Sequence, residues 1–160
     1  MPPAFSLNGR LLASDGSRRF SATLRWSQGD ATRILLTTPL GQALASIDVD
    51  TSGARLTAAD GRSYGAASLS GLARRGLGLS LPLEHLPWWM SGRNAPGAPA
   101  SSDAEGFTQH GWTVRYGARD ARGRPLRIDA ECDAGCGGPQ TGSQSGPLSV
   151  RLIIDQWLEP

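Results

Sequence analysis

The chain has 160 residues and a formal net charge of +2, a size at which a single domain, residues 1–160, buries a core without a metal or disulfide framework. All 16 basic side chains are arginine, yet the pairs Arg18-Arg19 and Arg74-Arg75 stand apart, whereas nucleic-acid binding requires basic residues gathered on one face. This charge pattern argues against a nucleic-acid partner, and no run approaches the ~20 apolar residues that span a bilayer.

Glycine and proline are abundant, with 21 and 11 residues. Many turns combined with short runs of leucine, isoleucine and valine favour a mainly β fold. In the first half, hydrophobic residues alternate with polar ones, which predicts five or six consecutive antiparallel strands separated by short turns. The expected strands cover residues 5–13, 19–27, 32–38, 42–50, 54–58 and 62–66.

The pattern changes at residue 67, where apolar residues recur at spacings of three and four. This spacing predicts two short helices, over about 67–75 and 83–91, with a glycine-rich bend between them. Trp88 and Trp89 cannot face the same way on a helix. We therefore expect one of them to pack inward and the other to cap an opening or lie near the surface.

Residues 93–106 form a polar loop rich in proline, alanine and serine. Strands are expected again over residues 107–118, 124–132 and 148–158. The order of strands, helices and strands predicts a curved antiparallel sheet with short helices on its concave side.

One catalytic pattern occurs, because Gly61, Ser63 and Gly65 match the G-x-S-x-G nucleophile elbow. The elbow requires a buried strand before it and a helix after it, whereas this motif lies in a predicted hairpin. His85 and His110 are the candidate imidazole bases, and neither has a neighbouring motif. The sequence thus predicts no catalytic residue, no cofactor and no enzyme activity.

Cys132 and Cys136 are the two cysteines of the chain. In an oxidising compartment they would form a disulfide, and elsewhere they would be free thiols. A zinc site would also need His85 and His110 to converge on them. We expect no metal site, and the disulfide and the free thiols remain alternatives.

A turn of Pro39, Leu40 and Gly41 separates two of the expected strands. A large apolar side chain is unusual where turn chemistry favours Asn, Asp or Ser. Leu40 either folds back onto the sheet or is held outward, with Pro39 fixing the entry to the turn and Gly41 supplying a conformation that other residues resist.

Six segments in order resemble the LolB family of outer-membrane lipoprotein receptors. The segments are "LRWSQ", "RILLTTPLGQALASI", "DGRSYGAAS", "GLSLPLEHLPWWMSG", "GWTVRYG" and "VRLIIDQW". The resemblance covers about residues 5–158. It implies a half-open antiparallel β-barrel with short helices covering an apolar cavity.

The resemblance also implies a function and partners. The family accepts the acyl chains of lipoproteins from the periplasmic carrier LolA and inserts the lipoproteins into the outer membrane, so we expect a monomer at the periplasmic face of that membrane. Pro39, Leu40 and Gly41 would be the membrane-insertion loop, with Leu40 protruding. The candidate lining of the lipid-binding cavity is Leu24, Trp26, Ile34, Leu36, Ile47, Leu56, Leu86, Trp89, Trp112, Val114 and Ile128.

Two points stay open at the level of the sequence. Each candidate cavity residue would equally fill a solid core, and a periplasmic scaffold or interaction module of similar fold is the alternative function. Family members are typically anchored through a lipidated N-terminal cysteine, but no cysteine precedes Cys132. Either the anchor was removed from this chain, or the chain is an unanchored relative.

Overall fold

A computed structural model describes residues 4–14, 19–66, 69–77, 81–96, 100–102, 106–109, 111–132 and 148–158. In this part of the chain, one antiparallel sheet of 11 strands has the order β6-β5-β4-β3-β2-β1-β11-β10-β9-β8-β7. The strands are β1 Phe5–Ser14, β2 Arg19–Gln28, β3 Thr32–Thr37, β4 Ala43–Asp50, β5 Gly53–Ala58, β6 Ser63–Ala66, β7 Ser101–Ser102, β8 Gly106–Gln109, β9 Trp112–Tyr116, β10 Arg127–Cys132 and β11 Leu148–Leu158.

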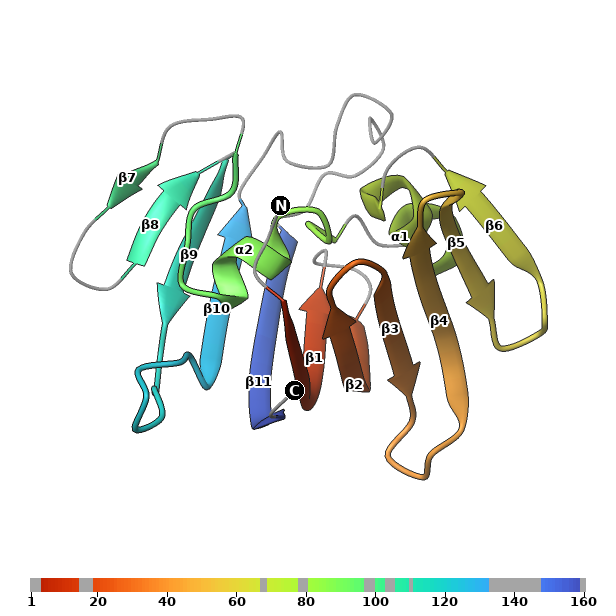
Figure 1. The fold of residues 1–160 in the computed structure, drawn as a ribbon, viewed down its shortest axis with the longest axis horizontal. Coiled ribbons are helices and arrows are strands. Elements are labelled where there is room, and N and C mark those ends of the chain that lie inside the picture. The colour runs from red at the N-terminus through yellow and green to blue at the C-terminus, as the bar shows by residue number, and fades with distance from the viewer. Residues whose placement is uncertain are drawn as a thin grey trace.

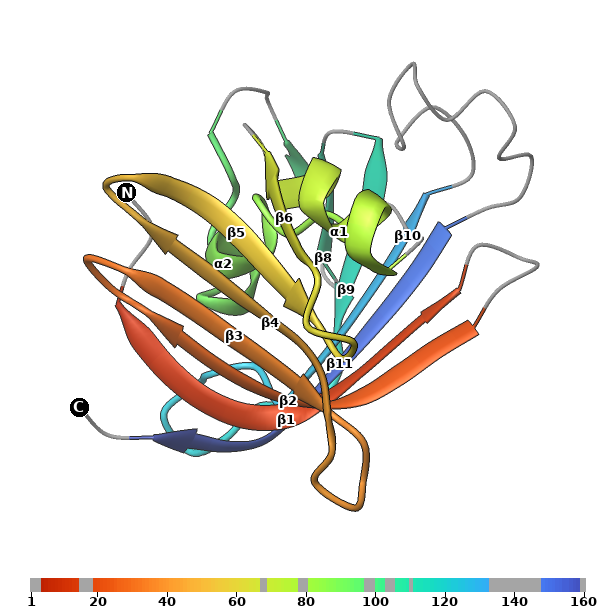
Figure 2. The same ribbon diagram turned by 90° about the vertical axis from the view of Figure 1, so that its right-hand side faces the viewer.

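The sheet curls around two short helices, α1 Leu69–Leu77 and α2 Leu86–Met90 (Figure 1). Seen from the side, the strands bend beneath the helices like a trough (Figure 2). The first and last strands meet in the middle, because β1 pairs with both β2 and β11. The outer strands β6 and β7 stand at opposite ends of the strand order. The expected mainly β, half-open antiparallel barrel with short helices is therefore confirmed.

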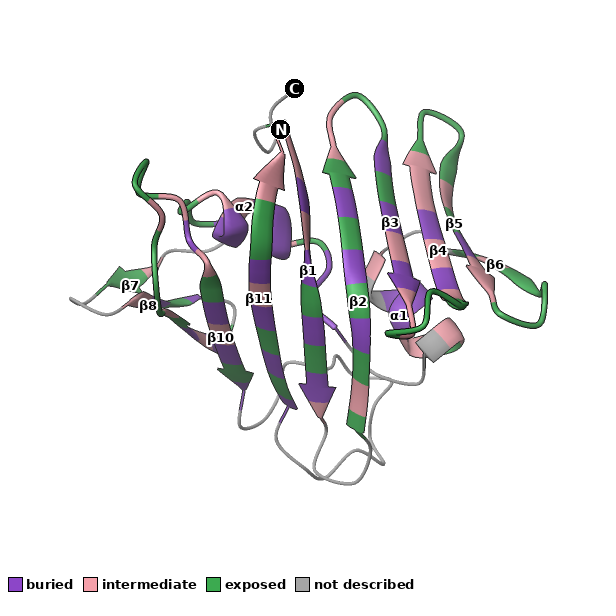
Figure 3. Ribbon diagram, turned by 90° about the horizontal axis from the view of Figure 1, so that it is seen from below, coloured by how far each residue is buried: buried purple, intermediate pink, exposed green. Residues whose placement is uncertain are grey.

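Alternation along the central strands separates the two faces of the sheet. On β2, the side chains of Ala22, Leu24 and Trp26 are buried, whereas Thr23 and Arg25 between them are exposed. Successive side chains of a strand point to opposite faces, so one parity meets the helices and the other meets solvent. The same striping runs across β1, β10 and β11 on the convex underside (Figure 3).

Helix α1 approaches the sheet closely at a glycine. A Cβ on Gly76 would lie 2.5 Å from Leu56 Cδ2, and Leu56 is completely buried on β5. The neighbouring Arg75 donates from Nη1 to the carbonyl oxygen of Gly65 at 2.6 Å. Because Gly65 belongs to the outer strand β6, Arg75 covers part of an edge that would otherwise offer a free acceptor.

The strands expected in the first half are confirmed, and so are two helices in the region predicted for them. The prediction of one continuous strand over residues 107–118 is wrong, because β8 and β9 form a hairpin there. Gly111 has a φ of 82°, a left-handed conformation that reverses the chain. The expected loop over 93–106 is also interrupted, since Ser101 and Ser102 form the short edge strand β7.

Candidate functional site

The eleven candidate cavity residues all lie in one apolar cluster inside the curl of the sheet. Each side chain is between 0% and 3% exposed, so the structure brings the predicted set together. They come from β2, β3, β4, β5, β9 and β10 and from helix α2. Burial alone fits both a cavity lining and a solid core, so their role stays a prediction.

Helix α2 presents its two tryptophans to different surroundings. Trp89 is completely buried, and its ring lies 6.3 Å from the Trp112 ring and 5.9 Å from the Phe107 ring. Trp88 is half-buried. The prediction that one tryptophan packs inward and the other lies near the surface is confirmed.

Gln109 holds the segment around α2 to the sheet. Trp89 donates from Nε1 to Gln109 Oε1 at 3.2 Å, and the backbone N–H of Ala95 donates to the same oxygen at 2.8 Å. Gln109 Nε2 donates in turn to the Ala95 carbonyl at 2.5 Å. Sequence reasoning missed this residue, although Gln109 shares strand parity with Phe107 and so faces inward.

Tyr116 makes a second polar attachment, because its hydroxyl donates to the Trp89 carbonyl at 2.6 Å. Burial raises the pKa of Tyr116 to about 12, while the nearby Arg119 guanidinium acts in the opposite direction. The phenol therefore stays a neutral donor at ordinary pH. Gln109 and Tyr116 together fix the position of Trp89 over the apolar interior.

The Pro39–Gly41 turn connects β3 to β4 and is a compact hydrogen-bonded hairpin. The N–H of Gly41 donates to the Thr38 carbonyl at 2.9 Å, and the N–H of Thr38 donates to the Gln42 carbonyl at 2.8 Å. Gly41 has a φ of 90°, a left-handed conformation that glycine adopts without strain at the end of a tight turn. The Leu40 side chain is 91% exposed, which confirms the outward alternative.

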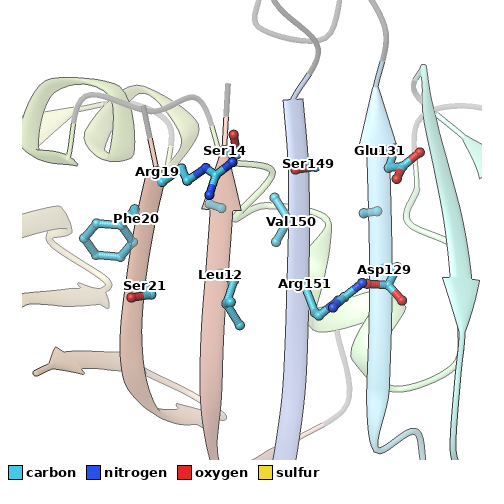
Figure 4. A pocket seen from close by; sticks show the side chains of 12 residues that line it. Leu12, Ser14, Arg19, Phe20, Ser21, Asp129, Glu131, Ser149, Val150 and Arg151 are labelled. Atoms are coloured by element: carbon cyan, nitrogen blue, oxygen red, sulfur yellow. The ribbon is translucent and has the colours of Figure 1, made fainter. Parts of the chain in front are cut away.

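A second exposed leucine, Leu12, lies in a groove formed by β1, β2, β10 and β11, whose lining side chains are shown in Figure 4. Leu12 is 41% exposed on β1, and beside it Arg151 on β11 donates to Asp129 on β10 at 2.6 Å. The groove has a volume of about 440 Å³ and is walled mostly by polar side chains from β2, β10 and β11. None of the eleven candidate cavity residues lines it.

The other residues that the sequence analysis singled out are a serine, two histidines and two cysteines. Those that lie in the described part of the chain do not come together as a catalytic or metal-binding cluster. Ser63 begins β6 in a hairpin, with its Oγ 3.4 Å from Thr57 Oγ1. Cys132 is buried at the end of β10, but Cys136 and His110 lie outside the described residues, so the disulfide stays a prediction. The described residues contain no group of three or more side chains suited to bind a metal ion.

The helices of the described residues are short. None of them is long and apolar enough to cross a membrane.

The fold and the site define a class: half-open barrel proteins that pack an apolar interior beneath short helices and expose a leucine on a rigid turn. Comparison with known families is more specific. The model of the family described as "Outer membrane lipoprotein LolB" matches residues 3–157, and the chain belongs to this family. The expected resemblance is thereby confirmed.

Individual relatives agree with this assignment. The chain is 40% identical to the outer-membrane lipoprotein LolB of Cupriavidus necator over 142 residues, which are 83% of this chain and 68% of that protein. It is 33% identical to the protein of the same name from Ralstonia nicotianae, over 93% of this chain and 76% of that protein. The corresponding protein of Chromobacterium violaceum is 30% identical, over 96% of this chain and 79% of its own length.

Proposed function

We propose that the chain is an outer-membrane lipoprotein receptor that takes acyl chains into its interior and inserts the lipoproteins into the membrane. The periplasmic carrier LolA would supply the cargo. The observation that carries the proposal is the division of apolar residues between two places. Eleven candidate lining residues are buried together, whereas Leu40 is held almost fully in solvent on a hydrogen-bonded turn.

The free-energy cost of exposing an acyl chain to water favours a receptor with an apolar interior. A chain of ~15 methylenes in water costs about 12 kcal/mol, at ~0.8 kcal/mol for each methylene. Direct passage from one apolar interior to another avoids this exposure. A receptor therefore needs an apolar volume that cargo can enter and a surface that brings the volume to the membrane.

Entry of cargo requires the interior to widen, because its candidate lining side chains are at most 3% exposed. Helix α2 is the element best placed to move, since it covers the interior with only five residues. Its polar attachments to the sheet come from Gln109 and Tyr116. Displacement of α2 would uncover Trp89 and Leu86 and expose the apolar faces of the strands beneath them.

Uptake of a fluorescent fatty-acid probe tests the proposal directly. We expect saturable binding with a blue-shifted emission, and competition by an acylated lipoprotein but not by the same polypeptide without its acyl chains. A carrier loaded with lipoprotein should lose its cargo to the purified chain. Absence of probe uptake, under conditions in which the carrier binds the same probe, would contradict the proposal.

A scaffold with a solid interior is the second candidate, and the close packing of the eleven residues is the observation in its favour. The probe experiment separates the two functions. A solid interior would take up no probe, and it would release no cargo from the loaded carrier.

Leu40 serves membrane contact in this proposal. Burial of one leucine contributes only about 1.5 to 3 kcal/mol, which is too little to hold a protein on a bilayer without a second signal. Leu40 would thus insert transiently into the membrane during delivery, and it would not anchor the protein there.

A further inference from the structure

A cleft of about 620 Å³ lies at the end of the sheet where β1 begins and β11 ends. Five separate segments form its walls: the start of β1, the end of β2, the end of β11, the last turn of α2 and the loop between β9 and β10. The described residues that line it include Arg119, Arg122 and Arg124 but no aspartate or glutamate. The lining of the cleft therefore carries positive charge, and Asp120, which lies outside the lining, forms an ion pair with Arg124.

Asp120 gives the arginine-bearing loop a fixed shape. Its Oδ1 accepts from the backbone N–H groups of Arg122 and Arg124, each at 2.9 Å, and its Oδ2 accepts from Arg124 Nε at 2.8 Å. Burial by itself would raise the pKa of Asp120, but the hydrogen bonds from Arg124 and Arg122 lower it. The loop is thus held by an ionised carboxylate that lies behind the cleft rather than in its lining.

Arg119 keeps its charge available to a ligand. Its guanidinium carbon lies 4.7 Å from the centre of the Tyr116 ring, and its Nη1 donates to the Gly123 carbonyl at 3.0 Å. Among the described residues, no carboxylate lies within ion-pair distance of Arg119. Guanidinium groups bind phosphate and carboxylate through paired, charge-assisted hydrogen bonds.

The opposite wall of the cleft is aromatic. Trp157 and Phe5 meet edge to face with ring centres 5.7 Å apart, and Arg124 lies 5.5 Å above the Trp157 ring. Trp157 Nε1 donates to the Pro125 carbonyl at 2.9 Å, which ties the aromatic wall to the arginine loop. Charge on one side and apolar surface on the other suit an anion that carries an apolar group.

The position of the arginine loop indicates where such an anion comes from. In Figures 1 and 2, the β9–β10 loop and the β3–β4 turn with Leu40 both project from the lower, convex side of the sheet. A lipid surface that meets Leu40 would therefore come close to the arginine loop as well. Leucine insertion and arginine contact with anionic headgroups would then act together.

We propose that this cleft binds the phosphate headgroup of an anionic phospholipid through Arg119, Arg122 and Arg124. This inference rests on the proposed function in one respect, that the protein works at a membrane. It does not depend on acyl chains entering the interior. Binding of a headgroup here would add to the weak membrane attachment that insertion of Leu40 provides by itself.

The test compares binding of the purified chain to phosphatidylethanolamine vesicles with and without phosphatidylglycerol. We expect phosphatidylglycerol to strengthen binding, and the double variant Arg119→Gln/Arg122→Gln to weaken the phosphatidylglycerol-dependent part about thirtyfold, the factor for two arginines near a membrane surface. The matched control is Arg33→Gln/Arg62→Gln, which removes two exposed arginines outside the cleft lining. The control should change binding less than about twofold. Equal losses in the two double variants would show a diffuse charge effect and overturn the site.

Soluble probes distinguish a lipid headgroup from a simple anion. Dihexanoyl phosphatidylglycerol should change the fluorescence of the wild-type chain but not that of Trp157→Phe, while dihexanoyl phosphatidylcholine and inorganic phosphate should bind at least about tenfold more weakly. A lipid site would be overturned if inorganic phosphate bound as tightly as dihexanoyl phosphatidylglycerol. It would also be overturned if Arg119→Gln/Arg122→Gln lost binding to the carrier while its binding to vesicles stayed unchanged. Fatty-acid uptake should be normal in Arg119→Gln/Arg122→Gln, so a failure of uptake in every variant would count against the proposed function and not against this cleft.

Discussion

The interior and the β3–β4 turn use the same kind of side chain in opposite ways. Leu56 and Leu86 are at most 1% exposed and belong to the buried apolar cluster. Leu40, in contrast, is 91% exposed on a turn held by hydrogen bonds of its backbone and of the Thr38 side chain. An interior leucine stabilises the fold by its burial. Leu40 contributes almost nothing of that kind, and we propose that it acts instead through contact with a membrane.

If this proposal holds, substitutions in the two regions should have different effects on stability and on lipoprotein transfer. Substitutions in the interior should change the free energy of unfolding, and their effects on transfer will be mixed with effects on folding. Substitutions at the turn should leave the fold intact and change transfer alone. The four predictions below test this separation in order of the expected change in stability.

Trp89→Ala should have the largest effect, a loss of about 3 to 5 kcal/mol in the free energy of unfolding. The indole is completely buried near the Trp112 and Phe107 rings. Its removal leaves a cavity and takes away one of the two hydrogen bonds that Gln109 Oε1 accepts, while the bond from the Ala95 N–H remains. Urea denaturation followed by far-ultraviolet circular dichroism measures the change. Trp88→Ala is the matched control, and equal losses in the two variants would contradict the different burial of the adjacent tryptophans.

Gln109→Leu should cost about 1 to 3 kcal/mol even though it makes the interior more apolar. The substitution leaves the N–H and C=O groups of Ala95 and the indole N–H of Trp89 without their partner. Thr108→Leu, at the exposed neighbouring position, is the control for the added leucine. If Gln109→Leu unfolded at the same or a higher urea concentration than the wild type, the attachment of α2 through Gln109 would be wrong.

Tyr116 should make stability fall in alkaline solution. Its pKa is about 12 in the folded chain against about 10 in an unfolded one, so folding favours the protonated phenol. The contribution is complete below pH ~10 and is lost as the pH rises from ~10 towards ~12. Tyr116→Phe should lose about 1 kcal/mol at neutral pH, with its hydrogen bond to Trp89, and should show a flatter decline above pH ~10. Urea unfolding of both proteins, measured in the same buffers from pH ~7 to ~12, checks this prediction. Parallel losses of stability above pH ~10 in the wild type and in Tyr116→Phe would contradict it.

Leu40→Glu should have the smallest effect on stability, within about 0.5 kcal/mol of the wild type. The side chain makes little contact with the rest of the molecule, and Gly41 and Thr38 maintain the turn without it. Gly41→Val is the contrasting variant, because a branched residue is strained at a φ of 90°. A large loss in Leu40→Glu would mean that the leucine folds back onto the sheet.

Much of the fold was predictable, because strand alternation is a local property. The parity of Leu24 and Trp26 on β2 and of Val114 on β9 follows from the spacing of residues, and the structure buries them as a set. The break between β8 and β9 was missed, since Gly111 has polar and aromatic neighbours that fit a continuous strand equally well.

The polar parts of the site were harder to predict. Gln109 gains its role only because Ala95 and Trp89, distant in sequence, fold against it. The arginine cleft similarly forms only where the two ends of the chain meet the β9–β10 loop. Turn chemistry, by contrast, placed Leu40 in a turn without any tertiary information, because proline and glycine on its two sides define a turn by themselves. It left the direction of the side chain open, and only the family resemblance indicated that the leucine protrudes.

Delivery of a lipoprotein from loaded carrier to vesicles tests the central claim most directly, with Leu40→Glu compared with Leu12→Glu. Both variants place a carboxylate at an exposed leucine, but only one of them lies on the β3–β4 turn. We predict that Leu40→Glu accepts cargo at the wild-type rate and fails to release it to vesicles, while Leu12→Glu accepts and releases it normally. Wild-type release by Leu40→Glu, or a failure to accept cargo at all, would contradict the division between an interior that holds acyl chains and a turn that delivers them.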